Sequence, residues 1–235
     1  MTNILNVIAA LAEAASAAPH AHDGRPRQPV VTVSRDYGAG GEVIAQRLAA
    51  ELKLPIYDDV VLQEVAARLN DDPSIVRMLD EGLGRAKDMW LYRLFSGKDV
   101  SPDTYRDTLI RVILSLGRMG GVIVGRGAHL ILAESCALRL RIAGSPEVCA
   151  RRLAAEGEGS YEAMLDRVNE VNRRRGKFIW DVFHSRLADA HQFDLTINTD
   201  RMEDLAEVAD LLVPLARAIH AGKVLRHDLG KAVEG

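Results

Sequence analysis

The sequence contains few cysteines and few aromatic residues, and each scarcity excludes a class of protein. The 235 residues include two cysteines, Cys136 and Cys149, which do not form a CxxC pair. Two reduced thiols are the simplest interpretation, and a disulfide-stapled scaffold is excluded. Aromatic residues make up 5% of the chain, which is too few for a surface that binds nucleic acid mainly by base stacking.

Long apolar runs are also lacking. No stretch approaches the roughly 20 consecutive apolar residues that a membrane-spanning helix needs. The nearest, residues 4–18, has no lysine or arginine ahead of it and is interrupted by Glu13, so it makes a poor signal peptide. A net charge of −3 argues against a general nucleic-acid coat protein but allows a local basic site. We therefore expect a cytoplasmic protein without nucleic-acid or membrane partners.

Composition divides the chain into three parts. Residues 1–28 indicate an alanine-rich amphipathic helix at 4–17 and a linker containing proline and glycine. We expect this helix to contact the body of the protein or a partner. Residues 29–220 carry the regular patterns of a folded domain, and residues 221–235 form a polar tail.

Short apolar strands alternate with helical patterns throughout the middle part. Strands are predicted at 30–33, 53–57, 122–124, 138–142 and 195–197. Helical patterns separate them, including a mostly helical stretch at 60–117, a long polar helix at about 160–184 and a last helix at 203–220. Strands joined through helices predict an α/β fold with a parallel sheet and helices on both faces.

A glycine-rich turn follows the first strand. Gly38, Gly40 and Gly41 lie between that strand and the next helix. Such a turn places backbone N–H groups and a helix N-terminus around one anion, and glycine lets a phosphate approach the backbone. We interpret this turn as a phosphate-binding loop.

Two loop patterns are each half present in this turn. The dinucleotide fingerprint GxGxxG has its first two glycines but Val43 at the third, with the acids Asp58 and Asp59 about 20 residues on. The P-loop pattern GxxxxGK[ST] has Gly41 at the lysine position and Glu42 after it. Neither pattern decides between a nicotinamide-dinucleotide protein and a phosphoryl-transfer protein.

Arginines later in the chain favour phosphoryl transfer. Arg126 follows a predicted strand within Gly125-Arg126-Gly127, which places it at the carboxyl edge of the sheet, where ligands bind in open α/β folds. A guanidinium there can grip phosphate oxygens. The long polar helix adds a basic cluster that could close as a lid over a transferring phosphoryl group: Arg167, Arg173, Arg174, Arg175 and Lys177.

From Pro29 to about Leu212 the chain resembles the cytidylate kinase-like family. The resemblance rests on six pieces in the expected order, namely Val31-Thr-Val-Ser-Arg-Asp-Tyr-Gly-Ala-Gly-Gly41, Leu54-Pro-Ile-Tyr-Asp58, Val122-Ile-Val-Gly-Arg-Gly-Ala128, Leu138-Arg-Leu-Arg-Ile142, Asn172-Arg-Arg-Arg-Gly176 and Asp194-Leu-Thr-Ile-Asn-Thr199. It implies a P-loop kinase-like fold that transfers the γ-phosphate of ATP, with Mg²⁺, to a nucleotide or a small phosphorylated acceptor. It also implies a helical acceptor-binding region at about 60–117 and a lid at about 160–184.

The resemblance assigns roles by position. The ATP phosphates would be held by the loop residues Gly38, Ala39, Gly40 and Gly41. The acceptor phosphate would be contacted by Arg126 and Arg106, and the transferred phosphate by Arg175. Asp58 is the candidate ligand of Mg²⁺. Because it precedes the loop, Arg35 is our candidate to replace the missing P-loop lysine.

Several positions depart from the family pattern. The aspartate expected beside the site arginine is Gly127, the lid aspartate is Asn172, and serine and arginine positions after the second strand are Asp59 and Glu64. Cytidine specificity is therefore not predicted. A nucleotide-binding regulator without turnover is one alternative, and a Rossmann-type NAD(P) protein is another, although the latter leaves Arg126 and the lid cluster unexplained.

Overall fold

The computed structural model describes residues 26–62, 104–133 and 137–224, together with residues 7, 9, 11 and 135. Most of the predicted N-terminal helix and linker, the tail from residue 225 and most of the helical region 60–117 lie outside the described residues, as do Cys136 and Glu64.

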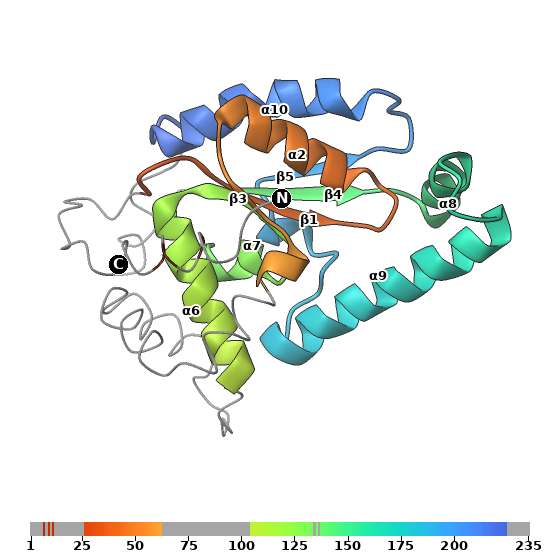
Figure 1. The fold of residues 1–235 in the computed structure, drawn as a ribbon, viewed down its shortest axis with the longest axis horizontal. Coiled ribbons are helices and arrows are strands. Elements are labelled where there is room, and N and C mark those ends of the chain that lie inside the picture. The colour runs from red at the N-terminus through yellow and green to blue at the C-terminus, as the bar shows by residue number, and fades with distance from the viewer. Residues whose placement is uncertain are drawn as a thin grey trace, which may run out of the picture.

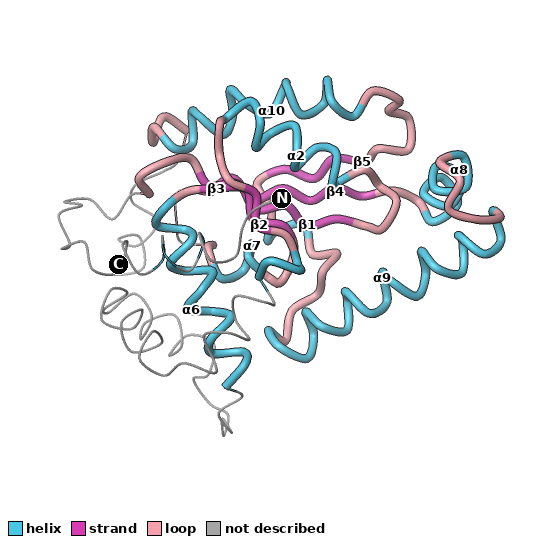
Figure 2. The backbone as a smooth tube through the Cα atoms, viewed as in Figure 1, coloured by secondary structure: helices cyan, strands magenta, loops and turns pink. Residues whose placement is uncertain are grey.

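The described residues form a five-stranded sheet in which every pair of neighbouring strands is parallel. Figure 2 shows these strands side by side at the centre of the molecule. Their spatial order is β2 (Ile56–Tyr57), β3 (Gly121–Val124), β1 (Val30–Arg35), β4 (Ala137–Ala143) and β5 (Leu195–Asn198).

Helices cover both faces of the sheet, as Figure 1 shows. One face is covered by α2 (Gly41–Leu52) and α10 (Leu205–His220), and the other by α6 (Thr104–Met119) and α7 (Ala128–Ile131). The chain then continues from β4 through α8 (Pro146–Ala155) and the long α9 (Tyr161–Phe183). A short 3-10 helix, η1 (Ala190–Gln192), precedes β5.

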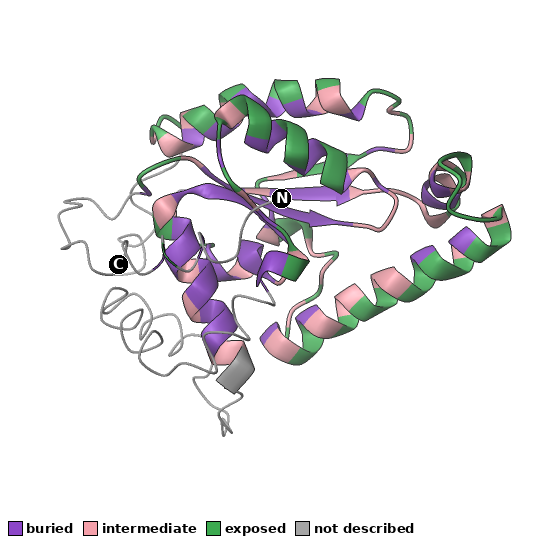
Figure 3. Ribbon diagram, in the orientation of Figure 1, coloured by how far each residue is buried: buried purple, intermediate pink, exposed green. Residues whose placement is uncertain are grey.

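The central strands β1 and β3 are buried on both sides because helices cover both faces of the sheet. In β1, Val31 and Val33 pack into the core beneath α2 and α10, whereas Val30 packs into the core beneath α6. In β3, Val122 and Ile123 divide between the two cores in the same way. Figure 3 shows these buried strands beneath α2 and α10, whose outer faces are exposed. A strand buried on both faces reads as a continuous apolar run, which is why the sequence located these strands well.

The predicted α/β parallel sheet with flanking helices is confirmed. Val43 is an exception, because the sequence pattern assigns it to the apolar face of its helix but it is 48% exposed. The face of α2 that packs on the sheet carries Ile44, Ala45 and Leu48 instead. Within the described part of the chain, no helix has the length and apolar character needed to cross a membrane.

Candidate active site

The glycine-rich turn lies between β1 and the N-terminus of α2, as predicted. Gly38 and Gly40 have φ values of 77° and 76°, a left-handed conformation that glycine adopts without strain. A Cβ at Gly40 would also overlap the Leu205 side chain at the start of α10. Glycine is therefore required here by backbone conformation and by packing.

Hydrogen bonds from residues outside the turn fix its backbone. Arg152 of α8 donates from Nη1 to the Gly38 carbonyl (2.8 Å) and from Nη2 to the Thr199 carbonyl (3.1 Å). The Thr199 hydroxyl donates to the carbonyl of Ala39 (3.0 Å), which is fully buried. These bonds fix two carbonyls of the turn and so give the loop a preformed shape.

Helix α9 is seated on the turn, which is the placement expected of a lid. The Tyr37 N–H donates to Oδ1 of Asn172 (2.8 Å), and Nη1 of Arg175 donates to the Arg35 carbonyl (3.1 Å). The guanidinium of Arg167 lies 5.3 Å from the centre of the Tyr37 ring, within the range of a cation–π contact. Three residues of the predicted lid thus contact the turn directly.

A cavity of about 350 Å³ lies between α9 and the carboxyl ends of β1 and β3. This is the edge of the sheet at which α/β proteins bind ligands. The cavity is lined by Ser34, Arg35, Asp59, Gly125, Arg126, Gly127, His129, Val171, Arg174, Arg175, Phe178, Ile179 and Leu187.

Three arginines and two carboxylates form one charged network beside this cavity. Arg35 donates from Nε to Oε1 of Glu42 (2.8 Å) and from Nη2 to Oδ2 of Asp59 (3.3 Å). Arg175 places Nη2 3.7 Å from the same Glu42 oxygen, and Arg126 places Nε 3.8 Å from Oδ1 of Asp59. The arginines come from three different elements, so the fold and not the local sequence brings them together.

Burial and nearby charges shift the pKa values of two of these arginines in opposite directions. Burial by itself would lower the pKa of Arg35, but the nearby carboxylates of Asp59 and Glu42 outweigh it and raise that pKa. Burial lowers the pKa of Arg175, and the positive charge of Arg35 lowers it further, although Glu42 partly offsets both effects. Both side chains remain cationic near neutral pH, because an arginine starts from a very high pKa. An anion entering between them would relieve their mutual repulsion.

The strand end and an aromatic ring orient Arg126. Its φ of 51° is a left-handed conformation, which is uncommon for a residue other than glycine and recurs at functional sites. Its guanidinium lies 5.1 Å from the centre of the Phe178 ring on α9. The prediction that Arg126 stands at the carboxyl edge of the sheet is confirmed by its place directly after β3.

Among the predicted site residues, Arg35, Arg126 and Arg175 line the cavity, whereas Asp58, Arg106 and the loop residues at 38–41 do not. Asp58 is exposed and accepts a hydrogen bond from the Val61 N–H (2.9 Å), whereas the neighbouring Asp59 faces the cavity. Arg106 lies on α6 with Nε 4.0 Å from Oδ1 of Asp107. The assignments of Asp58 to a metal and of Arg106 to the acceptor remain predictions.

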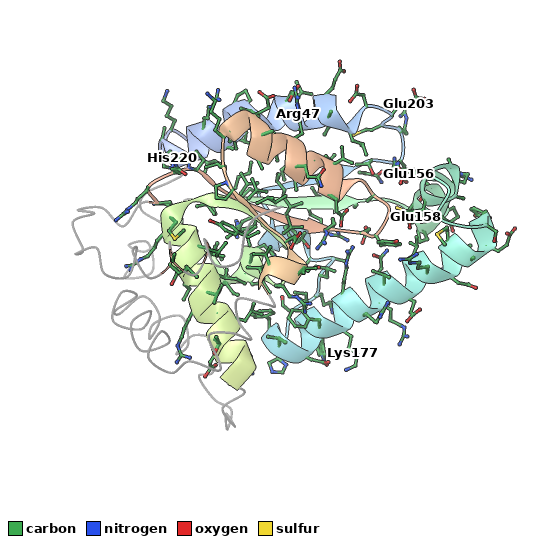
Figure 4. The ribbon with its side chains drawn as sticks, viewed as in Figure 1. Arg47, Glu156, Glu158, Lys177, Glu203 and His220 are labelled. Atoms are coloured by element: carbon green, nitrogen blue, oxygen red, sulfur yellow. The ribbon has the colours of Figure 1, made fainter. Side chains whose placement is uncertain are left out.

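The predicted lid cluster splits into separate groups. Arg174 and Arg175 line the cavity, and Arg167 pairs with Glu158 in the turn before α9 (3.6 Å). Lys177 projects outward from α9 (Figure 4) and pairs with Asp181 on the same helix (2.6 Å). Arg174 and Arg175 therefore face the cavity, Arg167 lies against Tyr37 of the turn, and Lys177 lies on the outside of α9.

From the sequence alone, His129 is expected to be a surface histidine, but the structure shows that this expectation is wrong. The side chain is 2% exposed, lines the cavity and stacks on Phe193 with ring centres 4.6 Å apart. Burial, and to a lesser degree the charges of Arg139 and Arg141, lower its pKa to about 4 despite a hydrogen bond with Gln192. His129 is therefore neutral at physiological pH and forms part of the cavity floor.

A phenylalanine of the lid accounts for the glycine at 127. Gly127 has a φ of 73°, and a Cβ there would overlap the Phe183 ring at the end of α9. Phe183 thus fills the room that a longer side chain at position 127 would need. No local sequence pattern indicates this contact, because the two residues are far apart in the chain.

The parallel sheet, the glycine turn at the start of α2 and the lid together define an α/β P-loop kinase-like fold. The sequence matches the cytidylate kinase-like family over residues 30–201, which is most of the chain, and the protein belongs to that family. This confirms the resemblance inferred from the six sequence pieces. Comparison with curated proteins gives no match.

Solved structures resemble this chain at low sequence identity, and one of them shares its fold with a TM-score above 0.5. An uncharacterized protein from Eubacterium ventriosum superposes with a TM-score of 0.62 at 18% identity, over 82% of this chain and 99% of that one. A shikimate kinase from Bacteroides thetaiotaomicron gives a TM-score of 0.44 at 15% identity, over 80% and 98% of the two chains. One from Acinetobacter baumannii gives 0.43 at 14% identity, over 85% and 97%. At these identities the likeness describes the fold and not the substrate.

Proposed function

We propose that the protein is an ATP-dependent phosphotransferase that moves the γ-phosphate of ATP to a nucleotide or another small phosphorylated acceptor. The observation that carries the proposal is the convergence of Arg35, Arg126 and Arg175 on one cavity beside the glycine turn. Phosphoryl transfer depends mainly on positioning and on stabilising negative charge, and arginines from several elements supply both.

The phosphates of ATP would lie on the turn and the N-terminus of α2. Backbone N–H groups of Gly38, Gly40 and Gly41 would face them there, whereas that of Ala39 donates to the Asp36 carbonyl (3.3 Å) within the turn. The left-handed glycines and the fixed carbonyls of the turn support this role, because a preformed loop needs little rearrangement to bind an anion.

The acceptor would occupy the cavity under the lid. Its phosphate would bind to Arg126, and the transferred group would pass between the turn and Arg175. An acceptor phosphate is already ionised near neutral pH, so its oxygen can attack in line without a strong base. Arg126 and Arg175 would then stabilise the charge that spreads over the transferred group.

The carboxylates near the turn are compatible with Mg²⁺. Mg²⁺ in phosphotransferases is held by one or two carboxylates together with substrate phosphates and water. Glu42 stands in the first turn of α2, and Asp59 lines the cavity, so both are placed to contribute. When bound, the ion would offset charge on the phosphates. The described residues contain no group of three or more metal-binding side chains that could hold a metal by themselves.

A nucleotide-binding regulator without turnover is the second candidate. It is favoured by the absence of a lysine at Gly41 and by the hydrogen bond between the Tyr37 N–H and Asn172, which engages one amide of the turn. Such a protein would bind ATP without forming ADP.

The test is ADP formation by the purified protein with Mg²⁺-ATP, alone and with a panel of nucleoside monophosphates and small phosphorylated compounds. Arg126→Ala is the inactivated variant, and Arg47→Ala, which changes an exposed arginine paired with Asp210, is the matched control. We avoid Gly40→Ala as the control because its Cβ would disturb Leu205 and hence folding. The proposal predicts acceptor-dependent ADP that Arg126→Ala loses and Arg47→Ala keeps. ATP binding without ADP under every acceptor would favour the regulator.

A further inference from the structure

We propose that Arg35 is the functional substitute for the P-loop lysine, reaching the terminal phosphates of ATP from the end of β1. The inference rests on the proposed function and adds a specific phosphate-binding residue to it. In the P-loop pattern the cation follows the last glycine of the loop, a position that is Gly41 in this chain.

Packing links the missing lysine to Arg35. A Cβ placed on Gly41 would lie 2.5 Å from Cβ and 2.8 Å from Cγ of Arg35, closer than real side chains approach. Gly41 is not in the left-handed region, so its backbone alone would accept a larger residue. The stem of Arg35 therefore occupies the room through which a side chain at position 41 would leave the helix. The Arg35 side chain thus fills the space that a lysine at position 41 would need.

The guanidinium of Arg35 lies between the two expected ligand sites. It bonds Glu42 in the first turn of α2 on one side and Asp59 of the acceptor cavity on the other. Its Nη1 lies 2.7 Å from the position that a Cβ on Gly125 would have, so the group reaches the end of β3. A phosphoryl group moving from ATP to an acceptor in the cavity must cross this place.

Arg35 retains donors for a phosphate. A guanidinium has five N–H donors, and two are used on Glu42 and Asp59, which leaves three among the contacts of the described residues. Glu42 is 49% exposed, so its carboxylate can turn into solvent when phosphate oxygens replace it. Arg35 is itself 7% exposed and held by neighbours on both sides, which keeps the cation in position before ligand arrives.

The competing explanation is that Arg35 has only a structural role, in which it links α2 to the segment after β2 by pairing with the carboxylates of Glu42 and Asp59. The two explanations differ in one testable respect. A phosphate-binding cation can be moved to position 41, where P-loops carry it. A structural link to Glu42 and Asp59 depends on the side chain at position 35 and cannot be moved in this way. The double variant Arg35→Gly/Gly41→Lys makes this exchange, because removing the Arg35 stem also removes the clash with a new side chain at 41.

Affinity for Mg²⁺-ATP, Mg²⁺-ADP and AMP is measured by calorimetry on the full chain. Arg35→Ala should weaken ATP binding about 10- to 100-fold and AMP binding much less, because AMP lacks the terminal phosphates. Gly41→Lys alone should be as weak, since its side chain collides with Arg35. The double variant should recover ATP affinity to within about threefold of wild type. Arg47→Ala is the matched surface control and should bind as wild type does.

Arg35→Lys covers the case in which the double variant does not fold. It keeps a cation at position 35, and it should bind ATP more tightly than Arg35→Ala. Thermal unfolding of every variant separates lost binding from lost structure. Unchanged ATP affinity in a folded Arg35→Ala, a folded double variant as weak as Arg35→Ala, or Arg35→Lys no better than alanine would each overturn the assignment and leave the proposed function standing. A wild-type protein that binds no ATP would overturn both.

Discussion

The N–H of Tyr37 and the side-chain oxygen of Asn172 lie 2.8 Å apart, and this hydrogen bond joins the glycine turn to the lid helix α9. The two residues are far apart in sequence, and both lie in stretches that carry the family resemblance. The bond seats α9, the predicted lid, on the turn. It also brings an uncharged amide, at a position where the family pattern has an aspartate, to the edge of the loop that we propose binds phosphate.

The charge at position 172 should control phosphate affinity. Asn172→Asp would place a carboxylate beside the loop and repel phosphate, so Mg²⁺-ATP binding should weaken about tenfold at low salt. Asn172→Ala frees the Tyr37 amide without adding charge and should not weaken binding. Calorimetric titration of the two variants at low and high salt distinguishes them. Equal affinity for both variants would show that ATP does not approach the turn near residue 172.

Folding stability should depend on pH through His129. The pKa of this side chain is about 4 in the folded protein and about 6.5 when exposed, so below pH 6.5 the unfolded chain binds a proton that the folded one does not. The contribution of the neutral His129 side chain to the free energy of unfolding is complete above pH 6.5. It is lost as the pH falls toward 4, which lowers the free energy of unfolding by on the order of 3 kcal/mol.

Denaturant unfolding of wild type and His129→Gln between pH 4 and 8 tests this. The wild-type free energy of unfolding should fall more steeply on the acid side than that of the variant. Parallel curves for the two proteins would mean that His129 is accessible to protons in the folded state.

An aspartate at position 127, which the family pattern has there, should destabilise this protein. Gly127→Asp forces a side chain into a left-handed backbone and against the Phe183 ring, so we expect a loss of about 2–4 kcal/mol in the free energy of unfolding. Adding Phe183→Leu to Gly127→Asp removes the ring and should restore part of that loss, even though the same change in the wild-type background removes core packing. Strictly additive losses would contradict the packing argument.

Arg126 and Arg175 should affect different steps. Arg126→Ala should raise the KM for the acceptor, because its side chain faces the acceptor cavity from the end of β3. Arg175→Ala should chiefly lower kcat, by about 10²–10³, since its guanidinium lies between the turn and the cavity. Steady-state kinetics with acceptor and ATP varied separately provide the measurement. Identical effects of the two variants on both constants would argue that they act only by holding the lid.

Much of the architecture could be predicted because local sequence determines it. The strand β3, which precedes Arg126, is a short apolar run, β1 begins with two valines, and the turn after β1 follows a short-range pattern. These patterns located the sheet, the glycine turn and the arginine at the sheet edge. The long polar helix was likewise recognisable, and Ser160 caps its start by accepting from the Ala163 N–H.

The remaining features depend on contacts between distant parts of the chain. Asp58 and Asp59 differ by one position, and only the three-dimensional structure shows that the second faces the cavity. The burial of His129 depends on Phe193, which approaches from the segment before β5. Glu42, which pairs with Arg35 and lies near Arg175, was seen in the sequence only as a departure from a motif. Such relationships leave no signal in a local pattern.

Transfer of label from γ-labelled ATP tests the central claim most directly. Wild-type protein is incubated with Mg²⁺, labelled ATP and each acceptor of the panel, and the products are separated. The account predicts that label passes from ATP to one class of phosphorylated acceptor in step with ADP formation, and that Arg175→Ala slows the transfer at least about 100-fold. Label that stays on bound ATP with every acceptor would contradict a phosphotransferase.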